Sequence, residues 1–136
     1  MSEQVPAALR SEVRRRANDR CEYCLIHFDD VMLSHEADHI IAIKHGGQTE
    51  SHNLAWACFL CNRFKGSDIA SIDPNTEQLT PLFHPRRDKW GDHFRLNEGR
   101  INALTAIGRV TTNILRFNTV ENIELRRMLQ AAGRLP

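Results

Sequence analysis

The chain has 136 residues, of which 41% are hydrophobic and 26% are charged. This length suits one domain with a modest core, and the composition lies within the range of globular proteins. No apolar run in the sequence approaches the roughly 20 residues that span a bilayer. A formal net charge of +1 is not the bulk signature of a nucleic-acid-binding protein. Composition therefore predicts a soluble protein without membrane segments and indicates no particular partner.

The first predicted element is a helix over residues 6–18. Pro6 suits the first turn of a helix, and Leu9, Val13 and Ala17 recur at the spacing of one helical face, with arginines around the rest. An apolar stripe requires burial, so we expect this helix to pack on the zinc knuckle formed by the cysteine pairs described next, rather than to enter a DNA groove.

Four cysteines occur as two C-x-x-C pairs, Cys21 with Cys24 and Cys58 with Cys61. Residues 1–6 lack the basic and apolar regions of a signal peptide, so we expect a cytoplasmic protein whose thiols stay reduced. Two such pairs complete a tetrahedral zinc site with no position left for substrate. The sequence therefore predicts a structural Zn²⁺ held by four thiolates, with a disulfide or free-thiol arrangement as the alternative.

Between the two cysteine pairs, residues 31–33 and 40–43 are short apolar runs rich in branched side chains, and the glycine pair 46–47 closes the second run. These features predict two strands and a turn. A short helix is predicted over residues 58–65, ending at Gly66 because glycine commonly ends helices.

The second half of the sequence contains patterns that predict further helices and strands. Turn-forming residues separate the apolar runs at 69–72 and 79–83, which indicates a hairpin or arm. Helical spacing of apolar residues predicts one helix over 105–117 and another that starts at residue 120, with Asn118 between them.

A set of segments shares the order and spacing of a known motif. The segments are Glu36-Ala37-Asp38-His39-Ile40-Ile41, Gly46-Gly47, Asn53-Leu54 and Cys58-Phe59-Leu60-Cys61-Asn62-Arg63-Phe64-Lys65-Gly66. Together with the first cysteine pair, they resemble the HNH endonuclease motif in its cysteine-rich branch. Two positions depart from the common pattern, because Asn62 stands where many members have histidine and Ala42 stands where a proline often follows.

The resemblance implies an α+β fold with a ββα-metal nuclease core. Its hairpin would carry Asp38 and His39 on the first strand, its loop would contain Asn53, and its helix would carry Asn62. The four-cysteine zinc site would staple this core, with the N-terminal helix and a C-terminal hairpin and helical extension around it.

The sequence shows no internal repeat and no flexible linker. We therefore expect a single HNH nuclease domain over residues 1–136, with its core at about 19–68 and a C-terminal extension at about 69–136.

The resemblance further implies metal-dependent hydrolysis of DNA phosphodiester bonds. His39, with an ordinary pKa of about 6.5, is the expected general base. Asp38 and Asn62 offer oxygen ligands that suit one Mg²⁺ or Mn²⁺, and Asn53 is expected to hold the loop and His39 rather than the metal. Neighbours on a regular strand point to opposite faces, so Asp38 and His39 can face one phosphate only where the strand ends or twists.

Double-stranded DNA is the expected partner, and its expected phosphate contacts are Arg63, Lys65, Arg86 and Arg87. We expect no catalytic role for the remaining histidines, which are His35, His45, His52, His84 and His93. Two alternatives stay open: a catalytically inactive zinc-knuckle module that binds nucleic acid, and a nuclease that acts on structured RNA. The sequence carries no signal for the oligomeric state.

Overall fold

The computed structural model describes residues 4–136, which divide into two compact units. The first unit spans Met1–Ile69, described from residue 4 onward, together with His84–Arg87. The second unit consists of Ala70–Phe83 and Asp88–Pro136. No helix in the described part of the chain is long and apolar enough to cross a membrane. The single domain expected from the sequence stays a prediction, and the segment that predicts a cytoplasmic location lies partly outside the described residues.

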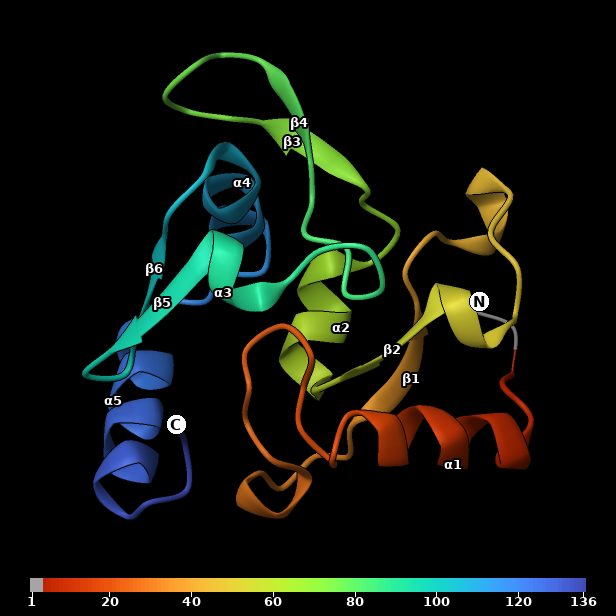
Figure 1. Cartoon of the computed structure of the whole chain (residues 1–136), viewed down its shortest axis with the longest axis horizontal. Coiled ribbons are helices and arrows are strands. Elements are labelled where there is room, and N and C mark those ends of the chain that lie inside the picture. Colours follow the sequence, from red (N-terminus) through yellow and green to blue (C-terminus); the bar gives the residue numbers. More distant parts are fainter. Residues whose placement is uncertain (1–3) are drawn as a thin grey trace. The chain divides into compact units, whose positions relative to one another are not determined.

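The first unit contains two helices, a two-stranded antiparallel sheet and three short 3-10 turns (Figure 1). They follow the order α1 (Ala7–Arg16), η1 (Phe28–Asp30), β1 (Glu36–His39), η2 (Ile43–His45), η3 (Ser51–Asn53), β2 (Leu54–Ala57) and α2 (Phe59–Lys65). In the register of the sheet, Asp38 lies opposite Ala55 and His39 lies opposite Leu54. The β1–β2 hairpin followed by α2 is the ββα arrangement that the resemblance implies, so the predicted α+β class is confirmed.

The predictions of strands at residues 31–33 and 40–43 are wrong. Met32 and Leu33 are exposed, so this apolar run has no partner surface to stabilise a strand. Residues 40–43 come after the end of β1, where the chain turns toward η2. The true second strand, β2, is buried at all four positions and lacks the alternation by which a half-buried strand is recognised.

Helix α1 covers one face of the hairpin. Val13 is fully buried against Leu54 and Trp56, and Leu9 and Ala17 pack against the same cluster. The predicted apolar stripe and its burial are therefore confirmed, but the stripe packs on the β1–β2 hairpin and not on the expected zinc knuckle. The helix is slightly shorter than predicted.

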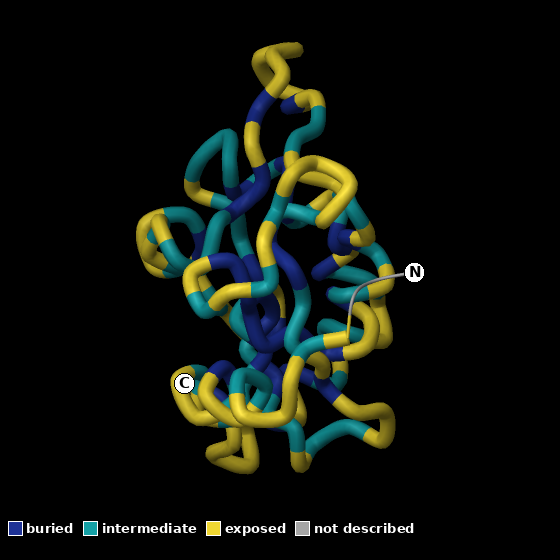
Figure 2. Tube along the Cα trace, turned by 90° about the vertical axis from the view of Figure 1, so that its right-hand side faces the viewer, coloured by how far each residue is buried: buried dark blue, intermediate teal, exposed yellow. Residues whose placement is uncertain are grey.

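The second unit contains two hairpins and three helices. Their order is β3 (Ala70–Ile72), β4 (Leu79–Pro81), α3 (Trp90–His93), β5 (Phe94–Asn97), β6 (Arg100–Ala103), α4 (Ala106–Ile114) and α5 (Val120–Ala131). The β3–β4 hairpin and the last two helices confirm the predictions, whereas the β5–β6 hairpin was not predicted from the sequence. Figure 2 shows that buried positions along the described part of the trace occur as short runs, separated by intermediate and exposed positions.

The core of the second unit is aromatic. Phe94 contacts Phe83 and Phe117 edge to face, with ring centroids 5.4 and 5.7 Å apart. Asp73 joins the β3–β4 hairpin to α4, because its carboxylate accepts two hydrogen bonds from Arg109, at 2.8 and 2.9 Å. These contacts stabilise the second unit, in which Phe83, Phe94 and Phe117 are buried.

Candidate functional site

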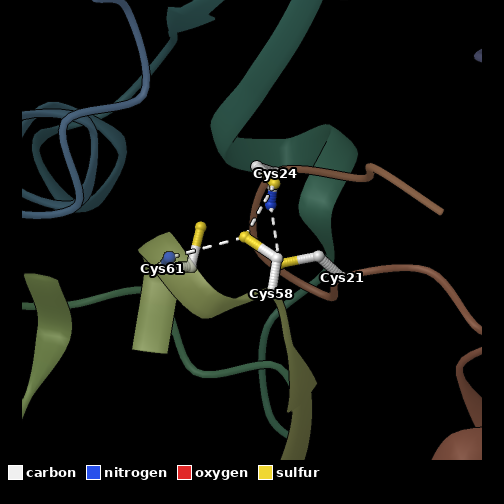
Figure 3. A group of neighbouring side chains, drawn as sticks. All are labelled: Cys21, Cys24, Cys58 and Cys61. Atoms are coloured by element: carbon white, nitrogen blue, oxygen red, sulfur yellow. Dashed lines mark hydrogen bonds between the residues drawn. The ribbon is translucent and has the colours of Figure 1, made fainter. Parts of the chain in front are cut away.

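The four cysteines converge from two segments of the first unit. All four are buried, and their sulfur atoms lie within 4.8 Å of one another. Figure 3 shows their side chains pointing toward one another. The sulfur atoms of Cys24 and Cys58 are 3.6 Å apart, and all four thiols are free. A tetrahedral zinc site with bonds of about 2.3 Å places its sulfur atoms roughly 3.8 Å apart. This cluster therefore suits a structural zinc ion.

Each pair lies in a turn that directs both sulfur atoms inward. The backbone N–H of Cys24 donates to Cys21 Sγ, and that of Cys61 donates to Cys58 Sγ, both at 3.4 Å. Leu25 closes the first turn with a φ of 72°, and Cys58 caps α2 at the second. Hydrogen bonds from Cys21, and then from Cys24 and Cys61, hold the pKa of Cys58 far below its ordinary value. The thiolate is the form of cysteine that binds metal.

A cavity of about 860 Å³ opens along β1. Every residue of β1 lines it, together with Arg10 from α1 and Asn62 from α2. Because successive strand residues point to opposite faces, a cavity lined by four in a row must approach the edge of the strand. That edge is free because the sheet has only two strands. Asp38 and His39 can therefore reach one cavity although they project to opposite faces.

Asp38 has a half-buried carboxylate whose Oδ2 atom is buried and unsatisfied. Its side chain is 14% exposed, and Oδ2 has no hydrogen-bond partner among the described residues. Burial raises the pKa of Asp38 to about 6, and the Lys65 ammonium opposes this shift. Lys65 Nζ lies 4.0 Å from Oδ2, too far for a hydrogen bond. Such an oxygen is a ready ligand for a hard divalent cation, and Asn62 offers a second oxygen at the same cavity.

His39 and Thr49 form the polar pair at the end of β1. His39 is 5% exposed and still lines the cavity. Its Nε2 lies 2.8 Å from Thr49 Oγ1. A hydrogen bond to one ring nitrogen fixes the orientation of the imidazole and determines which tautomer is favoured.

Asn53 closes the loop that follows β1. Its Oδ1 accepts from the N–H of Ile41, and its Nδ2 donates to the carbonyls of Ile41 and Gln48, each at 2.9 Å. Asn53 is buried and is not among the residues that line the cavity. Gly47 is required here, since a Cβ at this position would lie 1.7 Å from the Ile41 carbonyl oxygen.

Comparison with protein families decides the identity of this segment, because residues 21–68 match the model of the HNH endonuclease family. Residues 21–68 form an HNH domain. The match includes both cysteine pairs, the β1–β2 hairpin and α2, and it excludes α1 and all of the second unit. Searches of curated proteins and of solved structures found no match. The HNH domain indicates a nuclease or another function on nucleic acid.

Lys65 of the HNH domain does not lie where a phosphate contact requires. Its side chain is 2% exposed, and Nζ donates to the carbonyls of Ile40, at 2.9 Å, and His39, at 3.3 Å. The burial of Lys65 lowers its pKa, and the Asp38 carboxylate opposes this shift. We therefore correct the expected phosphate contact: Lys65 holds the end of β1 through the carbonyls of His39 and Ile40.

Arg86 is also turned inward. It forms an ion pair with Glu22, whose carboxylate accepts a second hydrogen bond from the Trp56 N–H at 2.7 Å. The Arg86 side chain is only 17% exposed, so this arginine joins residues 84–87 to the HNH domain instead of facing solvent. Of the expected phosphate contacts, Arg63 and Arg87 are exposed.

Three further residues clarify the site. His35 is fully buried and its Nε2 bonds with the Ile26 carbonyl at 2.9 Å, which agrees with a structural role. Thr49 was missed by sequence reasoning, since a threonine in a loop carries no signal of its contact with His39. Arg10 was missed as a lining residue because arginines surround the apolar stripe of α1 and only tertiary packing selects one of them.

Proposed function

We propose that the protein is a metal-dependent endonuclease that hydrolyses DNA phosphodiester bonds. The observation that carries this proposal is the convergence of Asp38, His39 and Asn62 on the cavity along the free edge of β1. The HNH family of this segment supports a nuclease. An imidazole beside two hard oxygen donors provides the groups that phosphodiester hydrolysis requires.

His39 is the proposed general base. In the tautomer that this role requires, Nε2–H donates to Thr49 Oγ1, and Nδ1 is the nitrogen that takes a proton from water. Asn53 supports this arrangement indirectly, because it fixes the carbonyl of Gln48, the neighbour of Thr49 in the chain. Its proposed role is to hold the loop and so the ring of His39.

Asp38 and Asn62 are the proposed holders of one Mg²⁺ or Mn²⁺. The unsatisfied Oδ2 of Asp38 fits this role, since hard cations prefer carboxylate and carboxamide oxygens. When bound, such an ion supplies Lewis-acid stabilisation of the charge that develops on the phosphate and the leaving oxygen. Lys65 keeps the end of β1 in place, so that Asp38 and His39 stay at the cavity.

The four cysteines are proposed to hold Zn²⁺ for structure alone, because four thiolates leave no open coordination position. Double-stranded DNA is the proposed partner, with Arg63 and Arg87 as surface contacts to phosphate because both side chains are exposed.

The proposal is tested on supercoiled plasmid with added Mg²⁺, with added Mn²⁺, and with a chelator followed by metal. We expect nicking or cutting with either ion, loss of cleavage in the chelator and recovery when the ion is restored. Zinc content is measured throughout, so that loss of the structural metal is not mistaken for loss of the catalytic one. Plasmid binding without cleavage under every condition would favour the binding module, and cleavage of structured RNA alone would favour the RNA nuclease.

A further inference from the structure

Arg10 belongs to α1, outside residues 21–68, yet it lines the cavity of the HNH domain. We propose that Arg10 binds a phosphate oxygen of the DNA in this cavity, beside the bond to be cut. This inference rests on the proposed function and adds a residue that the family match does not assign. It makes α1 part of the substrate site as well as a cover for the hairpin.

The register of the hairpin puts Arg10 and His39 on the same side. Residues directly opposite one another in an antiparallel pair share a face, so His39 lies on the face of Leu54. Helix α1 packs on that face through Val13. Asp38 projects to the other face. A phosphate at the edge of β1 would therefore meet His39 and Arg10 from one face and the proposed metal ligands from the other.

Protein contacts orient the guanidinium of Arg10 but do not occupy all of its N–H donors. Its central carbon lies 4.9 Å from the ring centroid of Trp56, and such stacking holds the planar group in one orientation. Its hydrogen bond to the His35 carbonyl is long, at 3.5 Å, and it forms no ion pair among residues 4–136. By contrast, Arg14 and Arg16 on the same helix donate to acceptors within the unit at short distances. Arg10 therefore retains N–H donors for a phosphate.

The other charged residues that line the cavity make the N–H donors of Arg10 important for phosphate binding. The cationic side chains that line it are Arg10 and Lys44, and the carboxylates are Glu36 and Asp38. These charges cancel, so general attraction does not explain phosphate binding at this place. A fixed guanidinium can provide it, because its fork matches the geometry of phosphate oxygens.

The test compares Arg10→Gln with Arg15→Gln, which removes the same charge from the same helix. Arg15 is exposed and does not line the cavity, so it is a matched control. For a short DNA duplex without added divalent ion, we expect Arg10→Gln to raise Kd about tenfold and to reduce the salt slope by about 0.9, the value for one lost phosphate contact. In plasmid cleavage, KM should rise by a similar factor. Arg15→Gln should change Kd by less than about threefold.

Equal losses of DNA affinity in the two variants would overturn the proposal, because they would show an effect of overall charge. Parental Kd and KM values for Arg10→Gln would overturn it as well. Thermal unfolding and zinc content show whether removing the contact with Trp56 unfolds the protein. If it does, Arg10→Lys decides, because it keeps the charge and loses the fork: weaker binding supports the proposal and parental binding overturns it. If the parent protein binds DNA but never cuts it, the proposed function is refuted. If the parent protein cuts DNA and the Arg10→Gln variant has the same KM, only the proposed role of Arg10 is refuted.

Discussion

Asp38→Asn should make the protein more stable while weakening its proposed divalent-metal site. The Asp38 carboxylate is half-buried, and its buried Oδ2 has no hydrogen-bond partner among the described residues. A carboxamide fills almost the same volume and carries no charge that burial penalises. It also offers a weaker ligand to Mg²⁺ or Mn²⁺ than an ionised carboxylate does.

The size and sign of the effect follow from the pKa of Asp38, which burial raises from 3.8 to about 6. The folded protein then holds the Asp38 proton more tightly than the unfolded chain, so ionisation of this group opposes folding. The cost is absent below the unfolded pKa, grows between about pH 4 and 6, and is complete above the folded pKa. A shift of about 2 units corresponds to about 3 kcal/mol. Asp38→Asn should therefore raise the free energy of unfolding by up to about 3 kcal/mol at pH 8 and by about half of that at pH 5.

Urea unfolding at pH 8 and pH 5, with zinc bound and no other divalent ion, measures this difference. Because both proteins keep the cysteine cluster, acid effects on zinc cancel in the comparison. Glu36→Gln is the matched control, since it removes an exposed carboxylate from the same strand and should leave stability nearly unchanged. A variant less stable than the parent at pH 8, or a difference that does not depend on pH, would refute the reasoning. Titration with Mn²⁺ should show weaker binding to Asp38→Asn.

His39→Ala should lower kcat by about 10²- to 10⁴-fold in single-turnover plasmid nicking with zinc content unchanged, and a parental rate would remove His39 as the base. Cys58→Ser leaves three thiolates, so the zinc content should fall below one ion per chain. The thermal midpoint should also drop, because zinc-binding energy is also folding energy. Parental zinc content and a parental midpoint would contradict the zinc site. Gly47→Ala places a Cβ 1.7 Å from the Ile41 carbonyl oxygen, which should destabilise the loop by about 1–3 kcal/mol. Gly91→Ala is its control, since a Cβ there meets nothing within 4 Å, and equal midpoints for the two variants would refute the steric argument.

The cysteine cluster and α1 were predictable because their signals are local or depend on spacing alone. Two C-x-x-C pairs specify a four-sulfur site wherever the chain brings them together, and the stripe around Val13 requires burial whatever its partner is. The β5–β6 hairpin could also have been predicted from the sequence. Apolar and polar residues alternate on both sides of Glu98-Gly99, and both of these residues adopt positive φ, at 49° and 80°. That pattern predicts a two-residue hairpin turn.

Other features depend on tertiary structure and have no local signal. Strand β2 is buried throughout, so its sequence lacks the alternation of a half-buried strand. A lysine in the HNH motif is expected at the surface, and the burial of Lys65 becomes predictable only when the carbonyls of His39 and Ile40 are known to need a donor. The contact between Thr49 and His39 likewise depends on the path of the loop, which Asn53 fixes through the backbone.

The ion pair between Glu22 and Arg86 attaches residues 84–87 to the first unit. Glu22 lies inside the first C-x-x-C pair, and its cation comes from residues 84–87, after the chain has passed through the β3–β4 hairpin. A truncated chain that stops at residue 69 would retain every residue of the family match and would leave this half-buried carboxylate without its arginine. During synthesis, this ion pair can form only after residue 86 has been added. The smallest piece that preserves it therefore begins before the HNH segment, with α1, and ends after it, at Arg87.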